Sequence, residues 1–273
     1  MEFFVQILIS AVVMGTPLLF ATLGGVISER AGVINLGMEG LMLVGALVAF
    51  IVMLNTGNYF LAVAAAALSS GIVSIIHGVV CLTLRASQIA SGLALTFFGT
   101  GLSGLFGDKL IGETIEPLNR IPIPGLNAIP LLGPVLFNHD VLVYFSYVCV
   151  ALLWWMLYKT RLGLNIRSMG EAPEVCDSLG LSVISYRFFA IISGGMLIGI
   201  GGAYFPLALT PFWVDGITGG RGWIAVALVI FAFWDPVKAL GGAYLFGLAL
   251  SLELRLQILG IEMSPYFLKM LPF

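Results

Sequence analysis

The segment from Glu29 to Gly40 joins two apolar runs and carries polar side chains in a mostly apolar setting. Asn35 and Glu39 stand four residues apart, so on a helix they would share one face. Ionisable groups at membrane depth are costly and usually serve a function. Two roles are therefore open for Glu39: part of a solute pathway or gate, or interfacial capping and packing with Arg30.

A second polar segment runs from Asp215 to Trp223, where a glycine-rich turn leads into a short apolar run. The N-terminus of a helix directs N–H groups outward and favours anions or polar oxygens. Arg221 is the only basic residue of this turn, which makes it the expected polar anchor. Solute contact and packing at the outer interface are both open for the turn.

A third segment, at about residues 159–187, combines basic residues with the signals of a short helix. Pro173 suits a first helical turn, and Gly180 suits the end of a helix. The acids Glu171 and Glu174 suit its positively polarised N-terminal end. We expect an amphipathic helix of about two turns. It either docks a soluble partner or lies on the membrane surface.

Enzymatic chemistry has no support in the sequence. His77 lies in an apolar run and His139 in a loop, without a second His or Cys at metal-ligand spacing, so we expect both to be hydrogen-bonded structural residues. The three cysteines offer no disulfide framework, and no lysine follows the GxxxxGK pattern of a phosphate-binding loop. A net charge of −2 leaves no broad basic field for nucleic acid. The sequence predicts no enzyme and no metal site.

Composition shows what must hold these polar segments in place. Of the 273 residues, 60% are hydrophobic and 10% are charged, whereas soluble domains carry roughly 25% charged residues. Because a helix needs about 20 apolar residues to cross hydrocarbon, we predict an all-α, polytopic transmembrane helical bundle with about 8–9 membrane segments. Eight apolar runs are the candidate segments: Phe3 to Ile27, Gly37 to Leu54, Tyr59 to Leu84, Ile89 to Phe106, Val141 to Tyr158, Phe188 to Leu209, Trp223 to Trp234 and Ala239 to Leu252.

Two long connections set the expected orientation. An outer proline-rich loop is expected at about 107–140, and the basic connection at about 159–187 is placed inside because positive charge favours the cytoplasm. The run from Trp223 to Trp234 is short, and if it were a half-helix, the orientation of everything after it would invert. A ninth segment beginning at Pro265 would be too short to cross, so we expect a truncated C-terminal helix.

The quoted segments together resemble the permease family of binding-protein-dependent ABC importers for branched-chain amino acids, ribose-type sugars and nucleosides. The pattern from Thr160 to Gly180, followed by a glycine-rich span from Ser193 to Ala203, is similar to the loop of that family that docks into the ATPase subunit. The resemblance implies an ATPase-coupling loop that contains Gly170, Glu171, Pro173, Glu174 and Gly180.

Within that family, three segments look like the nucleoside branch: Gly32 to Gly40, Gln88 to Thr96 and Gly219 to Ala225. They provide the candidate translocation-pathway residues Asn35, Glu39, Thr96 and Arg221. The alternative substrates are a simple sugar, riboflavin or a branched-chain amino acid. A secondary transporter that works without an ATPase is the alternative from another class, motivated by Glu39.

The resemblance implies one transmembrane permease domain over residues 1–273 in the bacterial cytoplasmic (inner) membrane, working by alternating access. The chain itself would hold no cofactor, because ATP would be bound by a partner ABC ATPase subunit. The other implied partners are an extracytoplasmic solute-binding protein, the lipid bilayer and a second permease subunit, homologous but different, which makes a heterodimer.

Overall fold

The long apolar runs form long helices, because a backbone in hydrocarbon must satisfy its own N–H and C=O groups. The computed structural model describes residues 2–126, 129 and 132–258. Within them, seven helices are long and apolar enough to cross a bilayer. They are α1 (Glu2–Arg30), α2 (Met38–Thr56), α3 (Tyr59–Gly78), α4 (Gln88–Gly107), α6 (Val141–Lys159), α9 (Val183–Tyr204) and α11 (Pro236–Ile258). The fold class is confirmed.

Short helical turns extend three of these helices. The π-helical turns η1 (Val79–Thr83) and η4 (Phe205–Leu209) continue α3 and α9, and the 3-10 turn η2 (Asp108–Leu110) follows α4. The span made by α9 and η4 starts at Val183, five residues before the expected Phe188. The basic connection is correspondingly shorter than the predicted 159–187.

The predicted segment from Trp223 to Trp234 is a short helix, α10 (Arg221–Phe231), so the count of eight full spans needs correction. Its 11 residues rise about 16 Å, roughly half of a bilayer core of about 30 Å. The chain reaches the outer end of the bundle after η4, where the carbonyl of Pro211 accepts from the N–H of Ile115 in the proline-rich loop. The half-helix and the turn before it cross together, so the orientation of α11 does not invert. The segment expected at Pro265 lies outside the described residues.

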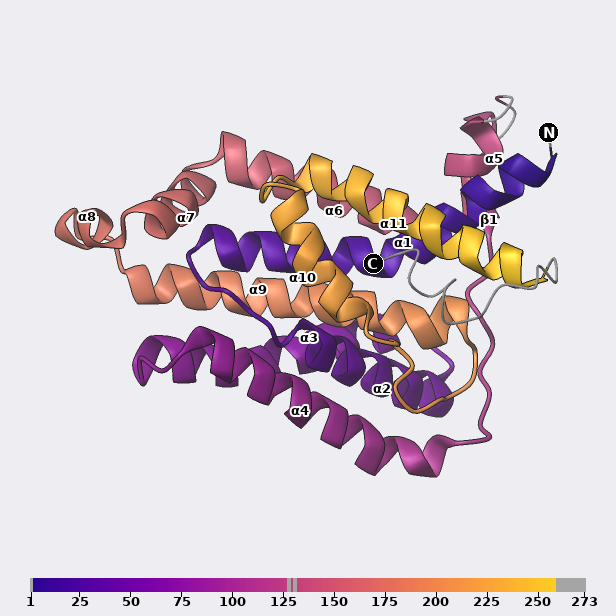
Figure 1. Cartoon of the computed structure of the whole chain (residues 1–273), viewed down its shortest axis with the longest axis horizontal. Coiled ribbons are helices and arrows are strands. Elements are labelled where there is room, and N and C mark those ends of the chain that lie inside the picture. Colours follow the sequence, from indigo (N-terminus) through magenta and orange to yellow (C-terminus); the bar gives the residue numbers. More distant parts are fainter. Residues whose placement is uncertain (1, 127–128, 130–131, 259–273) are drawn as a thin grey trace.

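We call the end of the bundle that carries Arg30 and the connection from α6 to α9 the inner end. That connection contains α7 (Arg161–Glu171) and α8 (Pro173–Ser178), which lie together at the left of Figure 1. The expected two-turn helix corresponds to α8. The longer helix α7 was not expected, although the hydroxyl of Thr160 caps it by accepting from the N–H of Gly163.

The opposite, outer end carries the proline-rich loop. It contains α5 (Leu132–Leu136) and the antiparallel pair β1 (Ile121–Pro122) and β2 (Asn138–His139). His139 is fully buried, and burial lowers its pKa; its Nε2 lies 2.7 Å from the carbonyl of Val135. Asp140 caps α6 and accepts a hydrogen bond from the Tyr204 hydroxyl, which fastens the loop to α9.

Three helices form the centre of the bundle. In α1, α2 and α9, 61%, 72% and 67% of the most apolar window is buried, against 33% or less in α3, α4, α6 and α11. Glycines allow the close approach: Gly45 of α2 lies against Gly199 of α9, and a Cβ on Gly24 of α1 would meet the carbonyl of Gly194. The peripheral helices therefore present the faces available to lipid or to another subunit.

Candidate functional site

Two interruptions of the helical bundle meet inside it. The first is the connection from Ala31 to Gly37, which leaves the inner end of α1 and enters the bundle without helical structure. Gly32 has a φ of +82°, a left-handed conformation that glycine adopts without strain. Asn35 lies in this connection and Glu39 in α2, so the prediction that they share a helical face is wrong.

The polar backbone groups of this connection bond to side chains from three other helices. The Nε of Arg187 donates to the carbonyl of Ala31, and the Oε1 of Gln88 accepts from the N–H of Ile34. The His77 ring bonds to the Ile34 carbonyl, and the hydroxyl of Thr96 donates to the Leu36 carbonyl. Buried backbone groups need such partners, so side chains of α3, α4 and α9 together stabilise the non-helical backbone of the connection.

Asn35 and Thr96, two of the expected pathway residues, lie against this connection. The Oδ1 of Asn35 accepts from the N–H of Gly37 at 2.8 Å, which stabilises the turn that starts α2. Asn35 and Thr96 are both buried. Both side chains bond to the backbone of the connection, and they determine its shape.

Glu39 joins the first interruption to the second. Its Oε1 accepts from the Thr218 hydroxyl at 2.5 Å and from the N–H of Gly220 at 2.9 Å, and its Oε2 accepts from the N–H of Gly222 at 2.6 Å. These N–H groups belong to the N-terminal end of α10, where helical amides lack internal partners. The carboxylate thus neutralises the positive end of the half-helix, about 16 Å from its inner end.

Arg221 is the first residue of α10 and lies beside this carboxylate. Its guanidinium lies over the ring of Phe205, 5.0 Å from the centroid. The charges of Glu39 and Glu253 both act on it. The junction therefore holds a basic and an acidic residue inside the membrane, where isolated charges would be costly.

The other end of α10 is also held by residues beside the first interruption. The Nε of Arg30 donates to the carbonyl of Trp234 at 3.0 Å, and the Trp234 Nε1 donates to the Oε2 of Glu29 at 2.6 Å. Phe233 and Trp234 adopt φ values of +52° and +53°, which end the half-helix sharply. Arg30 therefore does not pair with Glu39; the two side chains hold opposite ends of α10.

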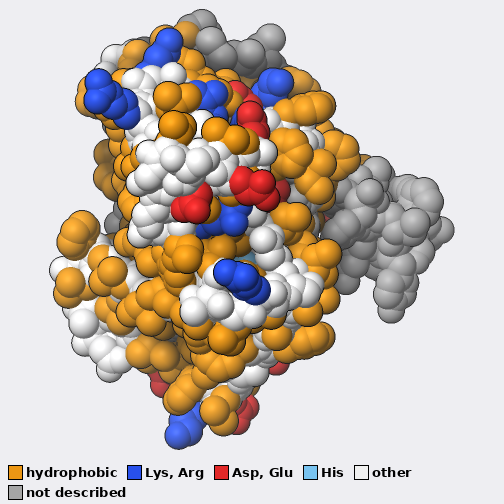
Figure 2. Space-filling view, turned by 90° about the vertical axis from the view of Figure 1, so that its left-hand side faces the viewer, with side chains coloured by type: hydrophobic (Ala, Val, Ile, Leu, Met, Phe, Trp, Pro, Cys, Tyr) orange, Lys and Arg blue, Asp and Glu red, His pale blue; other side chains and the backbone are white. Residues whose placement is uncertain are grey.

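The inner loop presents its acidic residues outward. Glu171 and Glu174 are exposed, Pro173 is the first residue of α8, and Gly180 follows that helix with a φ of +80°. Gly170 faces inward instead, against the carbonyl of Arg30. Figure 2 looks onto this end of the molecule and shows acidic and basic side chains gathered among hydrophobic ones.

Two apolar side chains are also exposed here, one in α8 and one just after it. Val175 and Leu179 are 58% and 75% accessible, whereas Cys176 is buried. An exposed apolar pair beside acids at a polar end of the molecule is unusual for a surface that faces only water. This end of the loop has the character of a contact surface.

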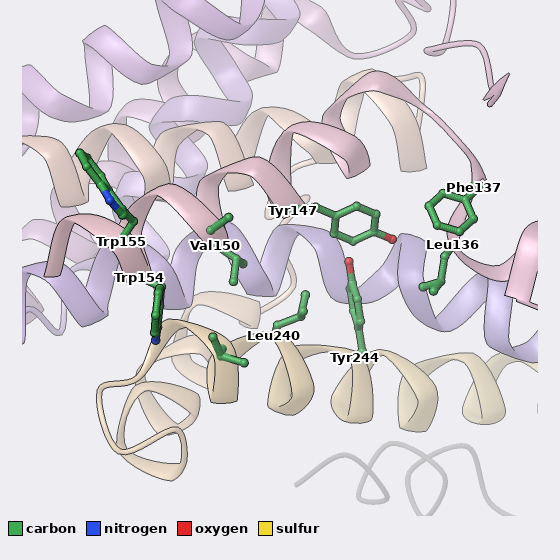
Figure 3. A pocket seen from close by; sticks show the side chains of 10 residues that line it. Leu136, Phe137, Tyr147, Val150, Trp154, Trp155, Leu240 and Tyr244 are labelled. Carbon is green, nitrogen blue, oxygen red and sulfur yellow. The ribbon is translucent and has the colours of Figure 1, made fainter. Parts of the chain in front are cut away.

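A groove of about 810 Å³ lies between α6 and α11, away from this junction. Its lining is almost entirely apolar, and in Figure 3 the hydroxyls of Tyr147 and Tyr244 point toward each other across it. None of the predicted site residues lines it. The groove therefore belongs to the lateral face of the bundle.

Four residues that hold the two interruptions were not singled out from the sequence: Gln88, Arg187, Thr218 and Trp234. Gln88 and Arg187 are polar residues at the edges of apolar runs, a position typical of many interfacial residues, so their type carries little signal. Thr218 lies in the quoted glycine-rich turn and gave the best signal. Among the described residues, no group of three or more His, Cys, Asp or Glu could hold a metal ion.

Comparison with known proteins adds a family. The model of a family described as "Branched-chain amino acid transport system / permease component" matches residues 7–270. A protein of Haloferax volcanii named "Putative glucose ABC transporter permease protein" is 44% identical over 97% of this chain and 82% of its own length.

Two bacterial relatives carry nucleoside names. A nucleoside ABC transporter permease protein of Lactococcus lactis is 36% identical, over 98% of this chain and 88% of its own length. A guanosine ABC transporter permease protein of Bacillus subtilis is 35% identical, over 96% and 89%. Among solved structures, an inward-facing putative metal-chelate type ABC transporter matches with a TM-score of 0.53 and 13% identity, over 92% of this chain and 77% of its own; this likeness concerns the fold.

Proposed function

The chain belongs to the permease family of branched-chain amino acid transport systems, and from this premise we propose that it imports nucleosides as the membrane path of an ATP-driven transporter. The family and the seven apolar helices make it a multi-pass protein of the cytoplasmic membrane and a transport component, not an enzyme. Members of this family work with ATPase and solute-binding partners.

The observation that carries the substrate proposal is the Glu39 junction. A helix N-terminus inside a membrane would be a ready site for an anionic solute. In this chain Glu39 already occupies it, with bonds to the N–H groups of Gly220 and Gly222. The junction therefore favours an uncharged polar solute, and a nucleoside fits that class, as the two bacterial relatives suggest.

Glucose is the second candidate, because the relative from Haloferax volcanii is 44% identical. It is also uncharged and polar, so the junction alone does not separate it from a nucleoside. The chemical difference between the two candidates is the nucleobase, which offers an aromatic plane for stacking that a simple sugar lacks.

For the pathway, we propose that the connection from Ala31 to Gly37 and the start of α10 form its wall. Asn35, Thr96 and Glu39 would shape this wall by holding backbone, as their hydrogen bonds indicate. Arg221 is the member of the predicted set whose guanidinium stacks on a ring, and would contact solute from α10.

For the partners, we propose that an ABC ATPase docks on the surface around α8, which is made by Glu171 at the end of α7, by Glu174 and Val175 of α8, and by Leu179 just after it. Pro173 starts α8 and Gly180 follows its end. The peripheral helices leave room for a second permease subunit. By the resemblance stated above, that subunit is a homologous but different chain, and a solute-binding protein delivers solute at the outer end.

The experiment that tests the substrate is a binding screen on the solute-binding protein that serves this permease. Calorimetry with guanosine, adenosine, uridine, glucose, riboflavin and leucine should give tight binding for at least one nucleoside. A charged analogue, guanosine monophosphate, is the matched control and should bind far more weakly. Tight binding of glucose, riboflavin or leucine with none for any nucleoside would contradict the proposal.

A further inference from the structure

The half-helix α10 and the connection from Ala31 to Gly37 form one connected unit. Glu39 binds the N-terminal end of α10, and Glu29 and Arg30 bind the turn after its C-terminal end. Both sets of residues flank the same connection. A shift of that connection would therefore act on both ends of α10 through Glu39 and through Glu29 and Arg30.

One side chain links this unit to the inner loop. Arg187, near the start of α9, donates from Nε to the carbonyl of Ala31 at 3.0 Å and from a terminal guanidinium nitrogen to the carbonyl of Met169 at 3.3 Å. Met169 lies near the end of α7 and is fully buried. Arginine suits this bridge because its planar head presents several donors in fixed directions, which a lysine ammonium cannot copy.

The backbone of α7 also lies directly on the unit. A Cβ on Gly170 would overlap the carbonyl of Arg30, and one on Gly32 would lie 3.0 Å from the Arg187 guanidinium and 3.2 Å from the Cα of Gly170. The end of α7 and the start of the connection are therefore in contact without intervening side chains. A movement of α7 toward the bundle would therefore press directly on the backbone at Arg30 and Gly32.

We propose that Arg187 is a positioning residue that transmits movement of α7 and α8 to the connection from Ala31 to Gly37 and, through Glu39, to α10. The inference rests on the proposed docking of an ATPase at the inner loop. Arg187 touches neither that docking surface nor the Glu39 junction, so its contribution is separable from both. It acts by keeping the two carbonyls of Ala31 and Met169 at a fixed separation.

The test uses the whole importer, purified with its ATPase and solute-binding protein and reconstituted in proteoliposomes. Uptake of radiolabelled guanosine and of radiolabelled glucose is measured in parallel with ATP hydrolysis, so the readout does not depend on which of these two solutes is native. For Arg187→Ala we expect the ATPase to remain bound and hydrolysis to continue, while solute imported per ATP falls about fivefold or more, the lower end of typical coupling between sites. The solute imported per ATP by Arg187→Lys should lie between the values for the wild type and for Arg187→Ala.

The matched control is Arg85→Ala, which removes an exposed arginine from the turn between η1 and α4 at the same end of the molecule. It should leave uptake per ATP unchanged. If Arg187→Ala yields too little folded protein, Arg187→Lys provides the measurement. A lower yield with unchanged uptake per ATP in the Lys variant would reduce Arg187 to a structural role and overturn the proposal.

The failure of the docking premise gives a different result. In that case the wild-type permease would retain no ATPase on purification, and hydrolysis would not respond to Glu171→Lys. That outcome would overturn both the docking and the transmission. Normal ATPase binding with wild-type coupling in both Arg187 variants would overturn the transmission alone.

Discussion

Glu39 has hydrogen-bond partners other than the one its place in the sequence suggested. The sequence offered a pathway role or capping with Arg30. In the structure Glu39 caps a helix, but the helix is α10, which begins more than 180 positions later. The carboxylate satisfies helical N–H groups that have no water available, and these groups in turn compensate its charge. A pathway role stays a prediction.

Glu39→Gln should therefore weaken the junction. The amide keeps the shape but loses the negative charge, and its NH₂ group turns a donor toward one of the amides it should accept from. Leaving such a buried group unsatisfied costs about 1–3 kcal/mol. We expect a lower melting temperature of the purified permease in detergent and reduced uptake.

The control for this change is Glu113→Gln in the exposed outer loop, which should alter neither quantity. A second variant, Gly222→Ala, tests the same contact sterically, because a Cβ there would lie 2.5 Å from the backbone nitrogen of Glu39. Full stability and full uptake in both Glu39→Gln and Gly222→Ala would contradict a stabilising role for the contact of Glu39 with α10.

At the scale of elements, α8 and the residues that flank it present acidic and apolar side chains together at an exposed end of the molecule. A helix of six residues has little stability of its own. Its conformation comes from the proline at its start, from α7 before it and from buried Cys176. Such an element is suited to be completed by a partner.

Replacing Glu171 and Glu174 by lysine should disrupt that partnership. Both side chains are exposed, so the permease should fold normally, while reversed charge at the docking surface opposes ATPase binding. We expect less ATPase on co-purification and uncoupling of hydrolysis from uptake. The matched control reverses two exposed acids of the outer loop, Glu113→Lys with Glu116→Lys; equal behaviour of the two double variants would reject α8 as the docking site.

The seven long helices could be predicted from the sequence, because membrane spans are determined by length and hydropathy alone. The run from Trp223 to Trp234 was counted as a membrane segment, with a half-helix as the alternative, and the structure shows the half-helix. The sequence did not indicate where its ends would lie. Those ends depend on Glu39 and Arg30, which are distant in sequence. The helix α7 was not predicted because the signals at Pro173 and Gly180 mark only the ends of α8.

On the scale of the whole molecule, three enclosed helices and a half-helix form a continuous structure from the inner loop to mid-membrane depth. The helix α9 packs against α1 and α2, and α10, which lies across α1 in Figure 1, contacts both α1 and α2. Neither a phosphate-binding loop in the sequence nor a metal cluster among the described residues accompanies it. As a family member, the chain needs energy and solute delivery from other subunits.

The most direct test of this account is solute accumulation by purified components in proteoliposomes. With permease subunits, ATPase and solute-binding protein together, radiolabelled guanosine should accumulate only when ATP is supplied to the ATPase side, and omission of any one component should abolish it. A proton or sodium gradient should not replace ATP. Accumulation of guanosine driven by an ion gradient, with this chain alone in the membrane, would contradict the central claim and establish a secondary transporter instead.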